Sequence, residues 1–332
     1  MKKLISIALL IALIGLSALT AFGCAPKAVQ VKTGLGVVTT FSKSKDAAAD
    51  ADGLAQADIV YVAVLVGDDG VIDNCVIDTI QSKVNFNAEG VVTTDLSTTY
   101  PSKLALGDNY NMKVASGIGK EWYEQANALA TYVKGKTLDQ VKAIALDESG
   151  KLTDADLLTS VTITVSGYLK AIEKAVNNAT HLGAKKGDVL TLNSVTSISK
   201  SKDATADAAG LGQGYATMGA VSLDSSKVIT SVAFDAIQAN VNFDNLGVVT
   251  SDIAGTAQTK QELGDNYNMK AASGIGKEWY EQANALAAAA TGKKIADAAA
   301  MPLTAEGNLV DLTSSVTITA TDYIEIFKMA SK

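Results

Sequence analysis

Apolar and polar positions change period several times along this chain, and each change predicts an element. Residues 36–40 form a β-rich run, and residues 58–66 form an almost continuous apolar run that is typical of a strand. The turn sequence GDDG at 67–70 separates this strand from another over 71–78. Two strands joined by such a turn predict a β-hairpin near the start of the chain.

Helical periodicity follows the hairpin. Residues 120–133 place apolar side chains on one helical face. The residues of this stripe are Trp122, Ala126, Leu129 and Val133. Gly135 is the expected C-cap, and Thr137 with Gln140 matches a capping box that predicts a second, short helix.

The β-branched run SVTITV at 160–165 then predicts a further strand. After it, Ser166 is expected to cap a last helix through Val176.

The whole pattern occurs twice. The segment LGDNYNMKVASGIGKEWYEQANALA at 106–130 recurs at 263–287, which is 157 positions later, and the copies differ only at Val114 versus Ala271. The second half keeps the strand–turn–strand order over 215–235 and its own SVTIT at 315–319. The sequence therefore predicts an α+β fold of two tandem homologous domains, each an antiparallel sheet whose β-hairpin packs against helices.

The first residues have the features of an export signal. Lys2 and Lys3 precede an apolar run at 4–16, which is short for a membrane-spanning helix, and AFGC at 21–24 resembles a lipobox with Cys24 as the lipidated residue. The expected location is the extracytoplasmic face of the cell membrane, with the exported chain held there by a lipid anchor; ordinary secretion is the alternative. The predicted boundaries are a lipoprotein signal peptide at 1–24, a tether at 25–32, repeat domain 1 at 33–178, a linker at 179–187 and repeat domain 2 at 188–332.

Composition excludes several classes of function. The net charge of −7 argues against nucleic acid as a partner, and all 28 basic residues are lysines, so guanidinium clamps are absent. His181 is the only histidine, which excludes a histidine metal site or a Ser-His triad within one chain. Cys75 aligns with Val232 and is expected to be a buried thiol that packs as a small apolar side chain. An electron-transfer or binding protein is favoured over an enzyme, although paired carboxylates at Glu121 and Glu124 remain an alternative.

The repeated block holds the candidate site. Ser116-Gly-Ile-Gly119 precedes a helix, where free N–H groups and the helix dipole favour an anion, and the aromatic and methionine side chains nearby offer surface for a ring. Such a site suits a phosphorylated aromatic ligand; the structural alternative is a glycine turn beside a core tryptophan. The candidate ligand-binding residues are Tyr110, Met112, Ser116, Gly117, Gly119, Lys120 and Trp122, with their copies Tyr267, Met269, Ser273, Gly274, Gly276, Lys277 and Trp279. No catalytic or metal-binding residue is assigned.

The hairpin with its DDG turn (62–72) and the Ser-Gly pairs at 116–117 and 273–274 resemble the FMN-binding domain family. The chain is also similar overall to duplicated surface lipoproteins of anaerobic Gram-positive bacteria. The resemblance implies FMN as the cofactor, a role in extracellular electron transfer, and a redox partner protein. The flavin-accepting threonine of that family would fall at Gly119 and Gly276, which have no hydroxyl, so any flavin must bind non-covalently.

Two functions follow from these observations. One is a membrane-anchored module that holds two flavins at a short, fixed separation for electron transfer. The alternative is a non-catalytic surface lipoprotein that binds a small ligand, a glycan or a partner protein, or that acts as a structural spacer.

Overall fold

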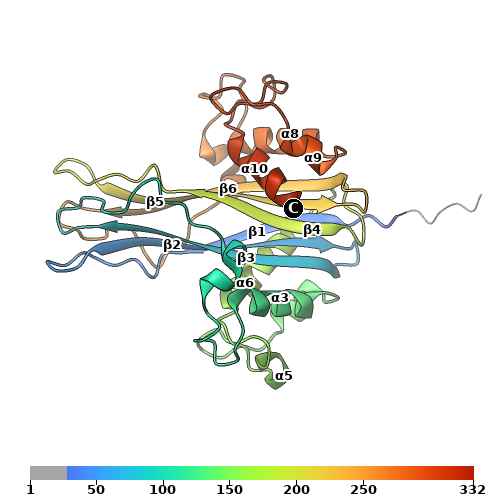
Figure 1. Ribbon diagram of the computed structural model, residues 1–332, viewed down its shortest axis with the longest axis horizontal. Coiled ribbons are helices and arrows are strands. Elements are labelled where there is room, and N and C mark those ends of the chain that lie inside the picture. The colour runs from blue at the N-terminus through green and yellow to red at the C-terminus, as the bar shows by residue number, and fades with distance from the viewer. Residues whose placement is uncertain (1–27) are drawn as a thin grey trace, which may run out of the picture.

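Two three-stranded antiparallel sheets lie at the centre of the molecule, and helices cover the outer side of each (Figure 1). The computed structural model describes residues 28–332, so the predicted signal peptide and Cys24 lie outside the described residues. The strand orders are β1-β2-β3 and β4-β5-β6, with every neighbouring pair antiparallel. Each half of the chain therefore has the predicted α+β composition.

The two halves have closely similar element orders. The first contains β1 (Lys32–Thr40), β2 (Gly53–Val66), β3 (Ile72–Phe86), α2 (Lys103–Leu106), the 3-10 helix η1 (Gly107–Tyr110), α3 (Trp122–Val133), α4 (Leu138–Lys142), α5 (Ala155–Leu158) and α6 (Ser166–Asn177). The second contains β4 (Val189–Ser197), β5 (Gly210–Leu223), β6 (Ile229–Phe243), α7 (Lys260–Leu263), the 3-10 helix η2 (Gly264–Tyr267), α8 (Trp279–Ala290), α9 (Ile295–Ala299) and α10 (Thr321–Ala330).

The predicted hairpins are confirmed, and their strands are longer than expected. β2 pairs with β3 from Gly53↔Phe86 to Val66↔Ile72, so the ladder extends well beyond the predicted 58–66 and 71–78. Side chains alternate between buried and exposed over residues 82–86, which is the period of a half-buried strand. The first strand, predicted from residue 36, begins at Lys32.

The predicted helix signals are also confirmed. All four residues of the apolar stripe on α3 are buried, and Gly135 follows the helix with a φ of 77°, a left-handed conformation that glycine adopts without strain. Thr137 and Gln140 form the expected capping box at the start of α4. One helix signal is an exception: the prediction that Ser166 caps the last helix of the first half is wrong, because the N-cap is Val165 and Ser166 is the first helical residue.

The predicted strands at 160–165 and 315–319 are wrong. The amides of Thr162 and Ile163 donate to the Gln125 side-chain oxygen at 2.8 and 3.2 Å, and Gln282 holds the second copy in the same way. A β-branched run signals extended backbone, but a fully buried glutamine on the neighbouring helix supplies the partner that a strand would have provided. The segment is therefore extended without joining a sheet.

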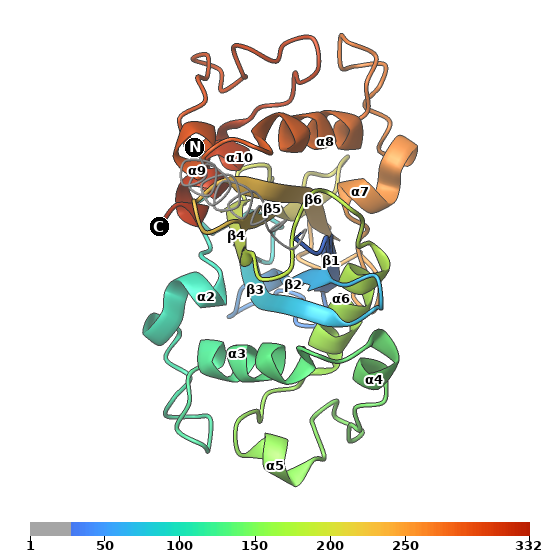
Figure 2. The same ribbon diagram turned by 90° about the vertical axis from the view of Figure 1, so that its right-hand side faces the viewer.

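The two sheets pack face to face and share one hydrophobic core. β1 faces β6, β2 faces β5 and β3 faces β4, which gives the layer order helix, sheet, sheet, helix in Figures 1 and 2. The shared core takes side chains from both halves, among them Ile59, Tyr61, Ile80, Met218 and Ile237. Each sheet packs its outer face on its own helices in a separate cluster. Because each half contributes one wall of the central core, the repeats are halves of one body.

Contacts between the halves are reciprocal. The amide of Ala47 donates to the Gly247 carbonyl, and the amide of Ala204 donates to the Gly90 carbonyl, both at 2.8 Å. Each of these pairs is related to the other by the offset of 157 residues. Such reciprocity is the signature of an isologous, two-fold interface, which here lies within one chain.

The stacked rings of Phe86 and Phe243, 3.9 Å apart and 3° from parallel, lie at the centre of this arrangement. Gly90 and Gly247 permit the close approach: a Cβ atom on Gly90 would lie 2.5 Å from the Asp244 carbonyl oxygen. Both glycines also have positive φ, so a side chain there would be strained as well as crowded.

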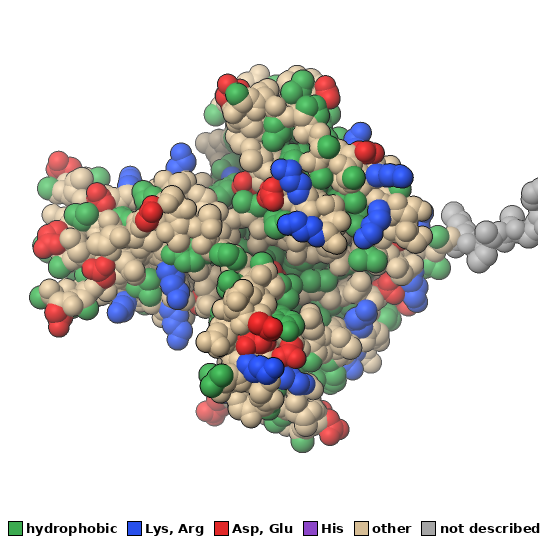
Figure 3. Space-filling view, in the orientation of Figure 1, with side chains coloured by type: hydrophobic (Ala, Val, Ile, Leu, Met, Phe, Trp, Pro, Cys, Tyr) green, Lys and Arg blue, Asp and Glu red, His purple; other side chains and the backbone are tan. Residues whose placement is uncertain are grey.

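The long axis of the molecule has two different ends. The described chain begins near the hairpin turn at 67–70, where Gln30 pairs with Lys185 and Thr33 pairs with Thr180, so the predicted tether and linker meet. The loops after β1 and β3 lie at the opposite end, where acidic side chains gather in Figure 3. Within residues 28–332 no helix has the length and apolarity needed to cross a bilayer.

Candidate functional site

The glycine loops, residues 112–120 and 269–277, are held by the chain's own carboxylates. Glu121, the N-cap of α3, accepts hydrogen bonds from the amides of Met112 and Lys113 at 2.8 and 3.0 Å. Glu124 in turn accepts from the Glu121 amide at 2.7 Å. Glu278 and Glu281 repeat the arrangement at α8. The positive end of each helix, where the sequence predicts an anion, therefore already has a carboxylate beside it.

Of the predicted loop residues, the glycines are exposed, and the serines form hydrogen bonds that hold the loop together. Gly117 and Gly119 are exposed, with φ of 67° and 64°, and so are Gly274 and Gly276, at 69° and 65°. Ser116 accepts a hydrogen bond from the Lys120 amide at 2.9 Å, and Ser273 accepts one from the Lys277 amide at 3.0 Å. The serines and glycines thus form a tight turn, and the serine hydroxyls are used within the loop.

The polar identities between the two copies have structural partners. Glu121 and Glu124 cap α3 and hold the glycine loop, while Gln125 holds residues 162–163. Burying a polar side chain is tolerated only when its hydrogen bonds are made, so these positions accept few substitutions. Packing and capping account for this part of the repeat without a ligand.

The predicted ring-binding residues surround a lysine. In the second half the Lys260 ammonium lies 4.6 Å from the Tyr267 ring centre, 5.4 Å from that of Trp279 and 5.0 Å from that of Tyr215. We call these four residues the lysine cage. In the first half Lys103 lies over Tyr110 and Trp122 at 4.6 and 5.4 Å. A desolvated cation over aromatic faces gains about 2 kcal/mol, so each lysine stabilises the outer core it enters.

Both tryptophans are almost fully buried. Trp122 is 1% exposed and Trp279 is 2% exposed, and the Trp122 indole N–H donates to the Tyr168 hydroxyl at 2.9 Å. A ligand ring can therefore reach only an edge of either indole, beside the lysine.

A cleft of about 450 Å³ opens beside the cage of the second half. Three of the predicted residues, Met269, Ser273 and Trp279, line this cleft together. Its other lining residues are Tyr215, Lys260, Ala272, Thr317, Ile318, Thr319 and Tyr323. Hydroxyl groups, one ammonium and several apolar or aromatic side chains thus face a space large enough for a small molecule.

The Lys260 ammonium has few polar partners. Its contact with the Tyr215 hydroxyl is 3.4 Å long. Burial lowers the pKa of Lys260 to about 8, although the carboxylates of Asp235 and Asp322 favour its charged form. The group is still mostly protonated at neutral pH and is available to an acceptor in the cleft.

The two halves differ at one side chain of the cage. Tyr215 aligns with Asp58, whose carboxylate accepts hydrogen bonds from Gln56 and Gln81 at 2.8 and 3.0 Å. The cleft of the second half therefore has an aromatic wall where the first half has a polar network.

A buried aspartate lies near each lysine cage, on β3 and on β6. Asp78 accepts from the amides of Thr79 and Leu104, and burial raises its pKa to about 6. Asp235 accepts from the amides of Ala236 and Gln261, and burial raises its pKa to about 7. Among residues 28–332, no group of three histidine, cysteine or acidic side chains is placed to hold a metal ion.

The two sets of candidate residues do not lie close together. α3 and α8 cover opposite outer faces of the double sheet, with both sheets between them (Figure 2). The expected short separation between two ligands is therefore wrong, because the sheets stack through the faces that are remote from the candidate sites.

The lysines, the buried aspartates and the cleft tyrosines are not among the site residues predicted from the sequence. Lys103 and Lys260 are 157 positions apart and just precede the repeated block, and Asp78 and Asp235 have the same spacing. Identity between the repeats is the signal by which all four residues could have been found. Tyr215 had no such signal, since its counterpart is Asp58.

Cys75 is buried in the outer core of the first half, as expected from its alignment with Val232. Burial raises the pKa of its thiol to about 12, so the reactive thiolate is disfavoured. The thiol packs as an apolar group.

Comparison with known proteins gives one partial likeness. No family model matches the sequence, and no solved structure matches it. The chain is 39% identical over 77 residues to a chlorophenol reductase of Desulfitobacterium hafniense. The match covers 20% of this chain and 24% of that protein, so the chain spans about a quarter of the length of the relative it matches.

Proposed function

We propose that this protein is a lipid-anchored, extracytoplasmic binding protein that arose by duplication and holds one planar, electron-poor ligand in the cleft of its second half. FMN is the ligand of choice, bound non-covalently for electron transfer to a redox partner. The observation that carries the proposal is the cleft itself, where the Lys260 ammonium meets Trp279, Tyr323 and Met269 around about 450 Å³. Flat rings favour aromatic walls, and an ammonium beside a flavin stabilises the charge gained on reduction. The named reductase, which is 39% identical to the chain over 77 residues, is in keeping with a redox role.

The phosphate contributes little to binding in this proposal. Glu278 occupies the start of α8, where an anion would otherwise be held, so the ring must supply the affinity. FMN and riboflavin, which lacks the phosphate, should therefore bind alike. A phosphate site at residues 273–276 would make FMN bind far more tightly than riboflavin.

Fluorescence titration of the mature protein with FMN and with riboflavin tests this directly. We expect saturable binding of about one flavin per chain, with Kd below about 100 µM, which is a modest affinity of a few kcal/mol. Flavin binding should weaken above pH 8, where Lys260 loses its proton. Lys260→Met should weaken binding at least tenfold and should also remove this pH dependence. Lys103→Met, the matched change in the first half, should leave it unchanged. Equal losses in the two variants, or no binding at 100 µM, would exclude the cleft of the second half as a flavin site.

A structural or partner-binding role is the second candidate, and the shared core favours it. Two halves fused through one core form a single body, with the start of the described chain at one end and acidic side chains at the other. A protein of this shape can present its distal end to a partner without any cofactor. If the protein binds no flavin, this structural or partner-binding role becomes the favoured proposal.

The anchor has its own test. Cys24→Ala should move the protein from the membrane fraction to the medium, because no other lipid attachment is predicted. Cell fractionation with immunoblotting measures this distribution. Retention of the variant on membranes would show that the chain is held by another means.

A further inference from the structure

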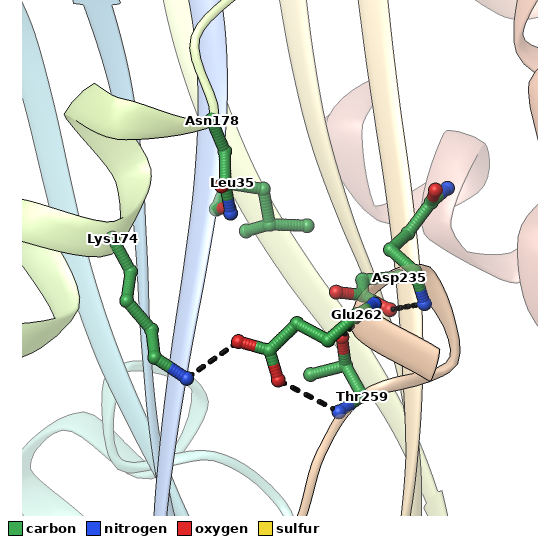
Figure 4. Close-up of polar contacts among 7 residues, drawn as sticks. Leu35, Lys174, Asn178, Asp235, Thr259 and Glu262 are labelled. Carbon is green, nitrogen blue, oxygen red and sulfur yellow. Dashed lines mark hydrogen bonds and ion pairs between the residues drawn. The ribbon is translucent and has the colours of Figure 1, made fainter. Parts of the chain in front are cut away.

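A larger cavity lies between the two halves, away from the lysine-cage cleft. Its volume is about 740 Å³. The first half contributes β1 and the segment after α6, and the second contributes β6, α7 and α8. Among its lining residues are Thr33, Leu35, Asn178, Asp235, Gln261 and Asn284. Figure 4 shows the two sides: Lys174, Asn178 and Leu35 face Asp235, Thr259 and Glu262.

Three polar residues of the lining are peculiar to this one edge of the double sheet. The two-fold arrangement creates an equivalent edge, where β4 faces β3 and α2. The residues that align with the cavity lining, 157 positions away in the sequence, show which side chains lie at that edge. Leu190 aligns with Thr33, Leu104 with Gln261 and Ala105 with Glu262. Apolar side chains meet the packing requirement of the fold at that edge. The three polar residues at the cavity edge have partners within the protein, since Thr33 contacts Ser231, Gln261 donates to the Phe234 carbonyl and Glu262 accepts from Lys174. The carboxyl group of Asp235 is the polar group whose partners remain to be examined.

Asp235 lacks a partner that its counterpart has. In the first half the Tyr61 hydroxyl donates to Oδ2 of Asp78 at 2.7 Å and contacts the Ser194 hydroxyl at 2.8 Å. Met218 replaces that tyrosine in the second half. The backbone hydrogen bonds to Asp235, from Ala236 and Gln261, both reach Oδ1. The Thr259 hydroxyl lies beside this carboxyl group. The carboxyl group is only 6% exposed and lines the cavity, and no tyrosine hydroxyl donates to its second oxygen.

Of the carboxyl groups that line the cavity, one forms no ion pair. Asp235, Glu262 and His181 are the titratable residues of its lining. Glu262 forms an ion pair with Lys174 across the two halves at 2.5 Å, and His181 contacts Asp68 at 2.9 Å. Lys260 is close to Asp235, but its ammonium lies inside the aromatic cage. Asp235 is thus the carboxyl group that can receive a donor from a ligand.

The remaining wall is apolar. Leu35, Val232, Phe234 and Ala287 line the cavity beside the polar groups. An apolar surface with one convergent carboxyl group is complementary to a short hydrocarbon that ends in a positive donor.

We propose that the inter-repeat cavity binds a small primary ammonium compound, with its charged nitrogen on Asp235 Oδ2 and its hydrocarbon body on Leu35 and Phe234. The ammonium takes the place that the Tyr61 hydroxyl occupies beside Asp78. This site is independent of the proposed flavin cleft, and either can fail without the other.

A series of probes with one hydrocarbon body tests the charge requirement. Hexylammonium, hexanol and hexanoate are titrated into the mature protein by calorimetry at pH 7.5. We expect saturable binding of one hexylammonium per chain, at least tenfold weaker binding of hexanol, and none of hexanoate. Hexanol binding as tightly as hexylammonium would overturn the proposal, because apolar burial alone would then explain the site.

Two variants locate the site. Asp235→Asn keeps the acceptor for both amides and removes the charge, so hexylammonium affinity should fall at least tenfold, whereas Asp78→Asn should leave it unchanged. Met218→Tyr rebuilds the arrangement of the first half and should abolish binding by placing a hydroxyl on Asp235 Oδ2. Circular dichroism and thermal melts check that each variant folds. If Met218→Tyr does not fold, the comparison of Asp235→Asn with Asp78→Asn tests the proposal. Unchanged affinity in a folded Asp235→Asn would refute the site.

Discussion

Phe86→Ala is expected to destabilise both halves of the protein in one transition, with a loss of about 3–5 kcal/mol in the free energy of unfolding. Phe86 is fully buried and stacks on Phe243, so its removal leaves a cavity in the core that the two sheets share. The loss should appear as a single shift of the urea midpoint, monitored by circular dichroism. Two independent domains joined by a linker would instead give two transitions, with only the first one shifted.

A double-mutant cycle separates the ring contact from simple cavity formation. Phe86→Ala with Phe243→Ala should cost about 0.5–1.5 kcal/mol less than the two single changes together, because the first removal already breaks the stack. Val114→Ala is the control, since this residue is 92% exposed and alanine stands at the matching position 271. It should change the unfolding free energy by less than about 0.5 kcal/mol.

Raising the pH from 4.5 to 8 should lower the free energy of unfolding by about 5 kcal/mol, about 2 from Asp78 and about 3 from Asp235, at 1.36 kcal/mol per pKa unit. The two pKa values are raised by burial from 3.8 to about 6 and about 7. The folded state therefore holds both protons more tightly than the unfolded state. This stabilisation is complete below pH 3.8 and is lost as the pH rises through 6 and 7.

Urea denaturation at several pH values measures this slope. Asp78→Asn and Asp235→Asn should each flatten it and raise stability at pH 8, because a neutral amide has no charge to desolvate. Asp207→Asn, an exposed position, is the matched control and should leave the slope unchanged. Lys260 lies outside this window, since its lowered pKa of about 8 adds stability only at higher pH. A flat profile in the unmodified protein would show that both aspartates are solvated.

Local patterns were sufficient to predict most elements of this protein. The apolar run at 58–66, the turn after it and the stripe on α3 each depend on neighbours in the chain, and all were confirmed. The capping box at Thr137 is likewise a contact between residues three positions apart. Such signals act within one turn or one hairpin, so the sequence carries them almost completely.

The candidate site was harder to predict because identity between repeats has more than one cause. Ser116, Gly117 and Gly119 do form a tight turn before a helix, but Glu121 caps that helix from within the chain. The partner of Gln125 is 37 residues away, so its structural role was invisible along the sequence. Only the folded chain shows which identical side chains hold the structure together and which of them face a cleft.

The sequence by itself determined the duplication, the order of the elements in each half, and the absence of arginine and of a histidine-based site. The tertiary structure decided that the halves close on each other through a common core, that the repeated aromatic residues enclose lysines, and that one edge of the double sheet has a polar cavity. Periodicity states which face of a strand is apolar, but not which surface will cover it. That choice depends on contacts between residues far apart in the chain, such as Phe86 with Phe243 and Lys174 with Glu262 in a helix of the other half.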